Sequence, residues 1–280
     1  MIAGKVLMDR NAPDALLDED DGCSATLRLL ERWHGRGRLA YAVTPRFAIT
    51  STPQQLAAAG EVVRQHPDVY VHTHISEHPD EIAATMTLFP EAADYLDVYA
   101  RHGLLTDRSV FAHGIHLSDD ELSRLRNAGA AIAFCPSSNL FLGSGLLELQ
   151  RVEAHGVALG VGSDVGGGTH LSMLATAADG YKAAQLTGRS WHPLAAFHAL
   201  TRGGAEALGL VDRIGTLAPG TDADLVVLDP AAGSLLAERV ASAATLTERL
   251  FACMFLGAEH AVARTYVGGA LRYQREGATS

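Results

Sequence analysis

Cysteine, net positive charge and long apolar runs are all scarce in this sequence. Cys23, Cys135 and Cys253 are odd in number and far apart, so they predict neither a disulfide framework nor a cysteine-based zinc knuckle, and we expect inert thiols. Acidic residues outnumber basic ones by 32 to 22, which argues against nucleic acid or an anionic membrane as a partner. No apolar stretch approaches the roughly 20 residues that span a bilayer, and no signal core follows Met1. These absences favour a cytoplasmic protein whose partner is a small molecule.

The chain is 48% hydrophobic, and apolar strands alternate along it with amphipathic helices, a pattern typical of βα units and a parallel sheet. We expect strands near residues 2–6, 39–44, 69–75, 109–113, 130–135 and 157–163. Beyond them we expect helices near 171–186, 193–199 and 202–208, a turn and a strand within 216–230, and a hairpin within 261–273 around Gly268-Gly269. The last strands form a small β appendage.

Two helix starts are marked by capping residues. Thr52-Pro-Gln-Gln55 supplies an N-cap, a proline at the first helical position and a capping-box glutamine, and Ser118-Asp-Asp-Glu121 supplies a second capping box. The residues expected to line the inner faces of these helices are Leu56, Ala59 and Val63 in the first, and Leu122, Leu125 and Gly129 in the second.

The strand count predicts an α/β fold of the TIM-like (β/α)8 type that is N-terminally incomplete. Six strand-and-helix units occupy the first ~210 positions, whereas a closed barrel of this type takes eight units and about 250 residues. We therefore expect residues 1–215 to carry six of the eight strands. Residues 216–280 are expected to hold the end of the barrel domain and the C-terminal part of a small β-sandwich.

Polar residues follow three of the predicted strands at their carboxyl ends. Asp164 ends the apolar run from Ala158 and precedes three glycines, His74 and Glu77 follow the strand near 69–75, and His113 precedes Gly114. Parallel barrels present metal ligands and bases at these strand ends. The sequence therefore predicts one hydrolytic metal site.

Six short runs in this order resemble guanine deaminases of the amidohydrolase superfamily: residues 4–11, 44–47, 74–77, 112–114, 135–139 and 162–165. The resemblance covers the chain to about residue 228. It implies a barrel of the metal-dependent hydrolase type, one Zn²⁺ per site, a homodimer, and hydrolysis of guanine to xanthine and ammonia.

The resemblance also implies roles for the polar residues. His74 and Asp164 correspond to metal ligands, and Asp164 would also accept the proton of the attacking water. Glu77 corresponds to the proton shuttle, which protonates the ring nitrogen and then the departing amine. His113 would hydrogen-bond the substrate or the metal-bound water. Zinc bound in this way lowers the pKa of its water toward ~7.

Arg46 and Phe47 are expected to bind the substrate. An arginine fork suits the acceptors O6 and N7 on one edge of guanine, and an aromatic ring suits the purine. Asn139, after Cys135-Pro136, could equally form an Asx turn, so we leave it outside the site.

The family pattern includes a His-x-His pair on the first barrel strand, and no run here matches it. His72-Thr-His74 has the right spacing, but Glu77 follows His74 as the fifth-strand motif requires, so we expect His72 to be a pocket wall or a core histidine. Two alternatives stay open: an amidohydrolase that acts on another amino-heterocycle, or a non-catalytic barrel fragment. With the pair absent, we expect little or no turnover from this chain alone.

Overall fold

The computed structural model describes residues 1–277, which group into two compact units. Unit 1 comprises Met1–Ala133 and Gln150–Ala158. Unit 2 comprises Phe134–Leu149 and Leu159–Ser280, of which residues 278–280 lie outside the described part. This grouping reflects compactness, whereas the predicted boundary at residue 215 separates a barrel from an appendage and stays a prediction.

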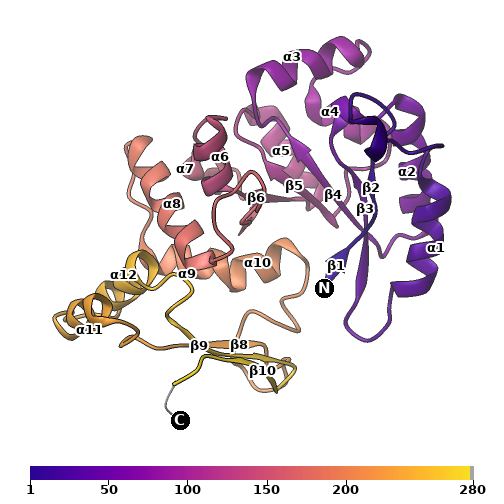
Figure 1. The fold of residues 1–280 in the computed structure, drawn as a ribbon. Helices are drawn as coiled ribbons and strands as arrows, with labels where there is room; N and C mark the ends of the chain where they lie inside the picture. Colours follow the sequence, from indigo (N-terminus) through magenta and orange to yellow (C-terminus); the bar gives the residue numbers. More distant parts are fainter. Residues whose placement is uncertain (278–280) are drawn as a thin grey trace. The chain divides into compact units, whose positions relative to one another are not determined.

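Unit 1 is built on a parallel sheet whose strand order is β1-β3-β4-β5-β6, with β2 also pairing with β3. Its strands are β1 (Ile2–Ala3), β2 (Val6–Leu7), β3 (Ala40–Pro45), β4 (Tyr70–Ile75), β5 (Ser109–His113) and β6 (Ala131–Phe134, whose last residue belongs to unit 2). Its helices are α1 (Cys23–Trp33), α2 (Pro53–Gln65), α3 (Pro79–Leu88), α4 (Tyr95–Arg101), α5 (Asp119–Ala128) and α7 (Leu149–Ala154, whose first residue belongs to unit 2). Figure 1 shows α1 and α2 side by side along β3. The predicted α/β class is confirmed.

The predicted first strand is divided into β1 and β2, which keep the same register against β3 on either side of the gap. A Cβ at Gly4 would fall 1.7 Å from the carbonyl oxygen of Ala42, so only glycine permits this approach. The next amide, that of Lys5, donates to the hydroxyl of Tyr41 (3.0 Å) instead of to a strand carbonyl. The interruption is therefore a local loss of ladder bonds.

Helix α2 begins as predicted, but its capping box is not formed. The Thr52 hydroxyl accepts from the Gln55 amide (3.2 Å), while the Gln55 side chain donates to Asp18 (3.2 Å) instead of returning to the N-cap. A buried partner for the glutamine has replaced the expected local bond. The three residues predicted to face inward are all buried: Leu56, Ala59 and Val63.

Helix α5 has the predicted capping box. The Ser118 hydroxyl accepts from the Glu121 amide (3.2 Å), and Glu121 accepts from the Ser118 amide (2.8 Å). Leu122 and Leu125 are buried as expected. Gly129 lies just beyond the helix as its C-cap with φ +75°, so its role is to end the helix rather than to line its inner face.

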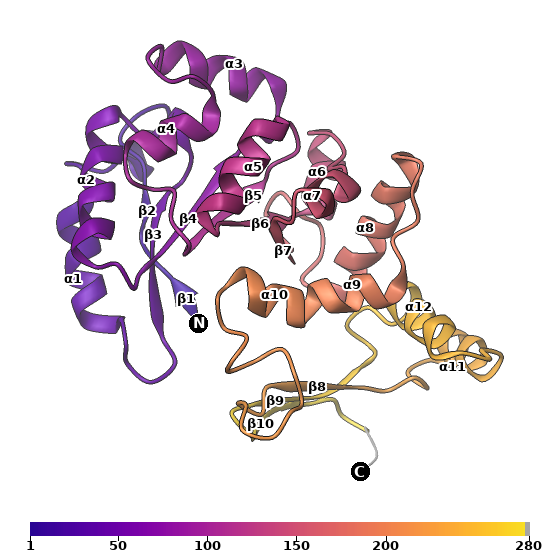
Figure 2. The ribbon, with the colours of Figure 1, turned by 180° about the vertical axis from the view of Figure 1, so that it is seen from behind.

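Unit 2 combines helices with an antiparallel sheet of order β10-β9-β8. Its elements are α6 (Pro136–Leu142), β7 (Ala158–Val161, whose first residue belongs to unit 1), α8 (Met173–Leu186), α9 (Pro193–Leu200), α10 (Arg202–Ala207), β8 (Leu225–Leu228), α11 (Ser234–Ala241), α12 (Leu246–Leu256), β9 (Val262–Val267) and β10 (Ala270–Gln274). The predicted hairpin is confirmed, since Val267 pairs with Ala270 across Gly268-Gly269. The view from behind in Figure 2 shows α11 and α12 side by side, as does Figure 1.

Two expectations from composition can be compared with residues 1–277. Cys23, Cys135 and Cys253 are free and buried, as predicted. Within the same range, no helix combines the length and the apolar character that crossing a membrane would require.

Candidate active site

The register of unit 1 brings two predicted site residues to the same sheet edge. His74 pairs with Ala112, and Ile75 pairs with His113, so both histidines lie at the carboxyl ends of neighbouring strands β4 and β5. Their rings stack with centroids 5.2 Å apart and an interplanar angle of 24°. His113 is fully buried. The predicted proximity of His74 and His113 is therefore observed within unit 1.

Glu77 reaches the same place from the turn after β4. Its Oε2 lies 3.6 Å from Nε2 of His113, and its backbone amide donates to Oε2 of Glu81 (2.8 Å). The turn passes through Ser76, a buried residue with φ +47°. A carboxylate and a buried imidazole thus lie close enough together to act on the same small molecule in acid–base chemistry.

The orientation of His74 is set by a backbone carbonyl. Its Nδ1 lies 2.6 Å from the carbonyl oxygen of Arg46, and its backbone amide donates to the same oxygen (3.3 Å). Donation from Nδ1 to a carbonyl fixes the tautomer that ligates metals through Nε2, and metal-binding histidines are commonly held in this way. The loop after β3 therefore controls the predicted ligand on β4.

Arg46 and Phe47 lie beside the histidines. The Phe47 ring is tilted by 55° against that of His74, with centroids 5.9 Å apart. The exposed guanidinium of Arg46 stacks on Phe47, with Cζ 5.0 Å from the ring centroid, a cation–π contact. Unit 1 thus gathers five predicted site residues: Arg46, Phe47, His74, Glu77 and His113.

Asp164 lies in unit 2, three residues beyond the end of β7, in a tight turn. Its carbonyl oxygen accepts from the amide of Gly168 (2.5 Å), and its φ is +47°. A Cβ at Gly168 would fall 1.8 Å from the Ser163 carbonyl oxygen, and a Cβ at Gly167 would fall 3.1 Å from Oδ2 of Asp164. Close approach within the turn therefore requires glycine at position 168, while Gly166 has φ +123°, a conformation that favours glycine.

Three of the described non-glycine residues with positive φ belong to these strand ends: Ser76, His113 and Asp164. Such backbone conformations are sparsely populated and cost on the order of 1–3 kcal/mol each, so surrounding contacts must hold them. Strain of this kind is typical of active sites. Two of the three, His113 and Asp164, are residues that the sequence predicts for the site, and their roles stay predictions.

Two residues left outside the predicted site, His72 and Asn139, lie in surroundings that differ from those expected. His72 is exposed, so the core alternative is wrong and only the pocket-wall alternative stays open. Asn139 lies inside the helix α6 and is buried, so it does not form the loop Asx turn that we considered. Pro136 is the first residue of α6, so a helix and not a loop follows Cys135.

The metal ligands stay a prediction. Among residues 1–277, no three histidine, cysteine, aspartate or glutamate side chains are grouped so as to hold a metal ion. The prediction named two protein ligands, His74 and Asp164.

A cavity of about 530 Å³ lies elsewhere in unit 1, against the C-terminal part of α2 and the chain after α4. None of the predicted site residues lines it. Its lining includes Gly60, Arg64, Pro67, His102 and Asp107.

Several residues that shape the site were missed. The Tyr99 hydroxyl donates to the His74 carbonyl oxygen, and Glu81 accepts from the Glu77 amide and from the Tyr95 hydroxyl. Glu81 was detectable in principle, because it stands three residues after His78, the N-cap of α3, and closes a capping box. The tyrosines carried no local signal, because the partners of the Tyr99 hydroxyl lie 25 to 51 residues away in the sequence and Glu81 lies 14 residues before Tyr95.

Comparison with known proteins identifies the family. The model of the amidohydrolase family matches residues 1–272, and the chain belongs to this family. A guanine deaminase of Escherichia coli (strain K12) is 48% identical over 276 residues, which make up 98% of this chain and 63% of that protein. A solved structure of the E. coli guanine deaminase superposes with a TM-score of 0.97 at 47% identity, covering 99% of this chain and 65% of the other. The predicted resemblance is confirmed.

Two more distant structures carry ligands. A guanine deaminase from C. acetobutylicum with guanine bound in the active site has a TM-score of 0.86 at 27% identity, covering 96% of this chain and 64% of that one. An adenosine deaminase from Xanthomonas campestris with bound zinc has a TM-score of 0.82 at 25% identity, covering 96% and 59%. This chain spans less than two thirds of the length of the relatives named here.

Proposed function

We propose that this chain carries residues of a guanine-deaminating site, at which guanine and water give xanthine and ammonia. The observation that carries the proposal is the cluster at the ends of β4 and β5: His74 stacked on His113, Glu77 3.6 Å from His113, and Phe47 beside His74. The similarity to the guanine deaminase of E. coli supports the same chemistry.

Zinc is the proposed cofactor, one ion per site, with His74 and Asp164 as protein ligands. The bond from Nδ1 of His74 to the Arg46 carbonyl fits this role, because it fixes the ligating tautomer. The bound zinc of the Xanthomonas campestris relative supports the choice of metal. When bound, zinc supplies a water whose pKa is lowered to about 7.

Protons are moved by the chain's own side chains. Glu77 would protonate the ring nitrogen of guanine first and the departing amine second, and Asp164 would accept the proton of the attacking water. His113, buried and 3.6 Å from Glu77, would hydrogen-bond the substrate and orient the carboxylate. Acid–base assistance of this kind is worth about 10²–10⁴-fold in rate.

The purine would be held by Arg46 and Phe47. Stacking on Phe47 limits the freedom of the guanidinium, so the fork is ordered before it meets O6 and N7 of guanine. The rest of the Phe47 ring offers an apolar surface to the base.

A cytoplasmic location and a homodimer complete the proposal. The location rests on composition, and the homodimer rests on the family resemblance. Sedimentation equilibrium of the purified chain measures the oligomeric state, and a monomer at micromolar concentration would exclude the homodimer.

The proposal is tested by following the conversion of guanine to xanthine by ultraviolet absorbance while zinc is titrated. The missing His-x-His pair predicts little turnover, so the rate is measured at high enzyme concentration, and residual zinc-dependent turnover that falls about 100-fold or more in Glu77→Gln supports the proposal. Glu61→Gln, an exposed carboxylate on α2, is the matched control and should leave turnover unchanged. Faster turnover of another amino-heterocycle would favour the sister-hydrolase alternative, and zinc binding without turnover of any base would favour the non-catalytic one.

A separate experiment tests whether Arg46 recognises guanine. Arg46→Ala should lower kcat/KM for guanine about tenfold to 100-fold, because a good bidentate contact is worth about 1–3 kcal/mol. Arg36→Ala, at an exposed position after α1, is the control. An equal loss for guanine and for bases that lack O6 would show that Arg46 does not recognise guanine.

A further inference from the structure

Two tyrosines of α4 face the same way and are buried. Tyr95 and Tyr99 are four residues apart, so they lie on one face of the helix, and their rings stack with centroids 5.7 Å apart. The Tyr99 ring also contacts Phe111 of β5, with centroids 5.6 Å apart. Phenylalanine would serve this packing equally well, so the two hydroxyls need a separate explanation.

The hydroxyl of Tyr99 joins the loop after β3 to the end of β4. It donates to the carbonyl oxygen of His74 (2.8 Å), accepts from the amide of Ala48 (3.0 Å), and lies 3.1 Å from the hydroxyl of Thr73. Thr73 also lies within donating distance of the Arg46 carbonyl (3.2 Å). One buried oxygen therefore connects the strand that carries the predicted ligand with the loop that carries the predicted substrate residues.

The hydroxyl of Tyr95 acts on the other end of the turn through a carboxylate. It donates to Oε1 of Glu81 (2.6 Å), and Oε2 of Glu81 accepts from the amides of Glu77 (2.8 Å) and His78 (3.1 Å). The backbone of Glu77 is thus held by Glu81, and Glu81 is held by Tyr95. Burial raises the pKa of both phenols, so both stay protonated and able to donate at neutral pH.

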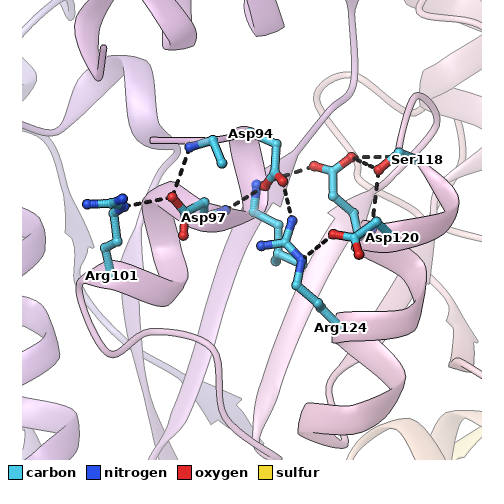
Figure 3. Close-up of polar contacts among 9 residues, drawn as sticks. Asp94, Asp97, Arg101, Ser118, Asp120 and Arg124 are labelled. Carbon is cyan, nitrogen blue, oxygen red and sulfur yellow. Dashed lines mark hydrogen bonds and ion pairs between the residues drawn. The ribbon is translucent and has the colours of Figure 1, made fainter. Parts of the chain in front are cut away.

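Helix α4 is itself fixed at its N-terminus. Asp94 caps the helix by accepting from the amide of Asp97 (2.8 Å), and Arg124 of α5 forms ion pairs with Asp94 and with Asp120, the latter at 2.9 Å. Figure 3 shows Arg124 between these two carboxylates. Glu121 of α5 accepts from the amide of Leu96 (3.3 Å). The helix that carries the tyrosines is therefore anchored against a neighbour.

We infer that Tyr99 and Tyr95 are positioning residues that hold the turn from His74 to Glu77, and with it the loop of Arg46 and Phe47, in its working geometry. The inference rests on the proposed function for the roles of these four residues, whereas the tethering can be measured without turnover. The turn needs such support because Ser76 has φ +47°, a conformation that a free turn would leave.

Hydrogen exchange tests the tethering, with single-atom deletions as variants. Tyr99→Phe should accelerate exchange about tenfold in peptides that cover residues 46–50, and Tyr95→Phe should do so in those that cover 76–80. Tyr41→Phe is the matched control, because that buried hydroxyl accepts from the Lys5 amide (3.0 Å) away from the turn. Exchange in both segments that matches the control would overturn the inference.

Kinetics separates positioning from a structural role. With guanine as substrate, Tyr99→Phe and Tyr95→Phe should lower kcat about tenfold or more while Tyr41→Phe does not, because misplacement of catalytic groups by about 1 Å can cost 10²-fold. Faster exchange with kcat equal to that of Tyr41→Phe would show that the tyrosines only stabilise the fold, which also overturns the inference. If the wild-type chain shows no measurable turnover of guanine, as the missing His-x-His pair predicts, hydrogen exchange alone decides the tethering.

Discussion

Replacing Gly60 by alanine should destabilise this protein, although the same change strengthens an isolated helix. Gly60 lies inside α2, where an ideal Cβ would fall 1.7 Å from the carbonyl oxygen of His102, the residue that follows α4. Real Cβ atoms essentially never approach closer than 3.0 Å, so α2 and the end of α4 must separate by at least 1.3 Å, the difference between the two distances. The obstacle is backbone, which cannot rotate away as a side chain can.

The size of the effect follows from two opposing contributions. Alanine favours a helix interior by about 1 kcal/mol over glycine. Overpacking that forces a backbone shift costs about 1–3 kcal/mol and occasionally more. The shift also weakens contacts of the buried Leu56, Ala59 and Val63, which share the inner face of α2. We expect a net loss of about 1–2 kcal/mol in the free energy of unfolding.

Urea unfolding followed by far-ultraviolet circular dichroism measures this loss, with the m-value checked for each variant. Gly204→Ala is the matched control, because Gly204 also lies in a helix and its Cβ would meet only the Ala199 carbonyl oxygen at 3.5 Å, an ordinary contact. The control should be neutral or stabilised by up to about 1 kcal/mol. A Gly60→Ala protein as stable as the wild type would refute the close approach of α2 to His102.

Three further predictions concern reactivity, acidity and the turn after β7. Burial, with nearby aspartates, raises the pKa of Cys23 to about 12, so thiol-specific reagents at pH 8 should label it rapidly only after unfolding; fast native labelling would contradict its burial. Bonds from the Ala93 amide and from Arg101 lower the pKa of Asp97, so its stabilisation is present above the unfolded value of about 3.9 and is lost as pH falls through the lower folded value. Asp97→Asn should therefore lower the urea midpoint more at pH 6 than near pH 2; equal effects at both pH values would refute the sign. Gly168→Ala places a Cβ 1.8 Å from a carbonyl oxygen of its own turn and should lower guanine turnover about 100-fold; unchanged kcat would show that the turn is irrelevant to the reaction.

Most elements of the parallel sheet could be predicted from the sequence because their signals are local. Apolar runs with turn residues at both ends located β3 to β6 within one or two residues, and the box from Ser118 to Glu121 fixed the start of α5. The gap between β1 and β2 depends on how closely Gly4 approaches Ala42, which is a tertiary fact. Helix α12 was not predicted, although Thr245 and Glu248 form a capping box at its start. The strands expected on both sides of it led us to predict a β appendage for this part of the chain.

The proximity of His74 and His113 could be predicted from their places along the strands, whereas their roles in a site stay predictions. Polar residues at the carboxyl ends of β4 and β5 must lie at one edge of a parallel sheet, so the neighbourhood of His74 and His113 followed from the strand assignment. The orientation of His74 could not be predicted from the strand assignment. It depends on the carbonyl oxygen of Arg46 and on the hydroxyl of Tyr99, and neither a backbone acceptor nor a partner 25 residues away leaves a pattern in the sequence.

The strained backbone bears on the choice between an enzyme and a non-catalytic fragment. Glycine at position 76 or 113 would remove a conformational cost on the order of 1–3 kcal/mol, and the chain instead carries serine and histidine there. Packing alone does not explain the direction of the hydrogen bonds, because Glu81 and Tyr99 use theirs to hold the backbone of Glu77 and His74. A fold that only needed stability would be served better by relaxed turns and apolar side chains at these strand ends. The retained strain therefore favours a turn that is kept for the chemistry of His74, Glu77 and His113.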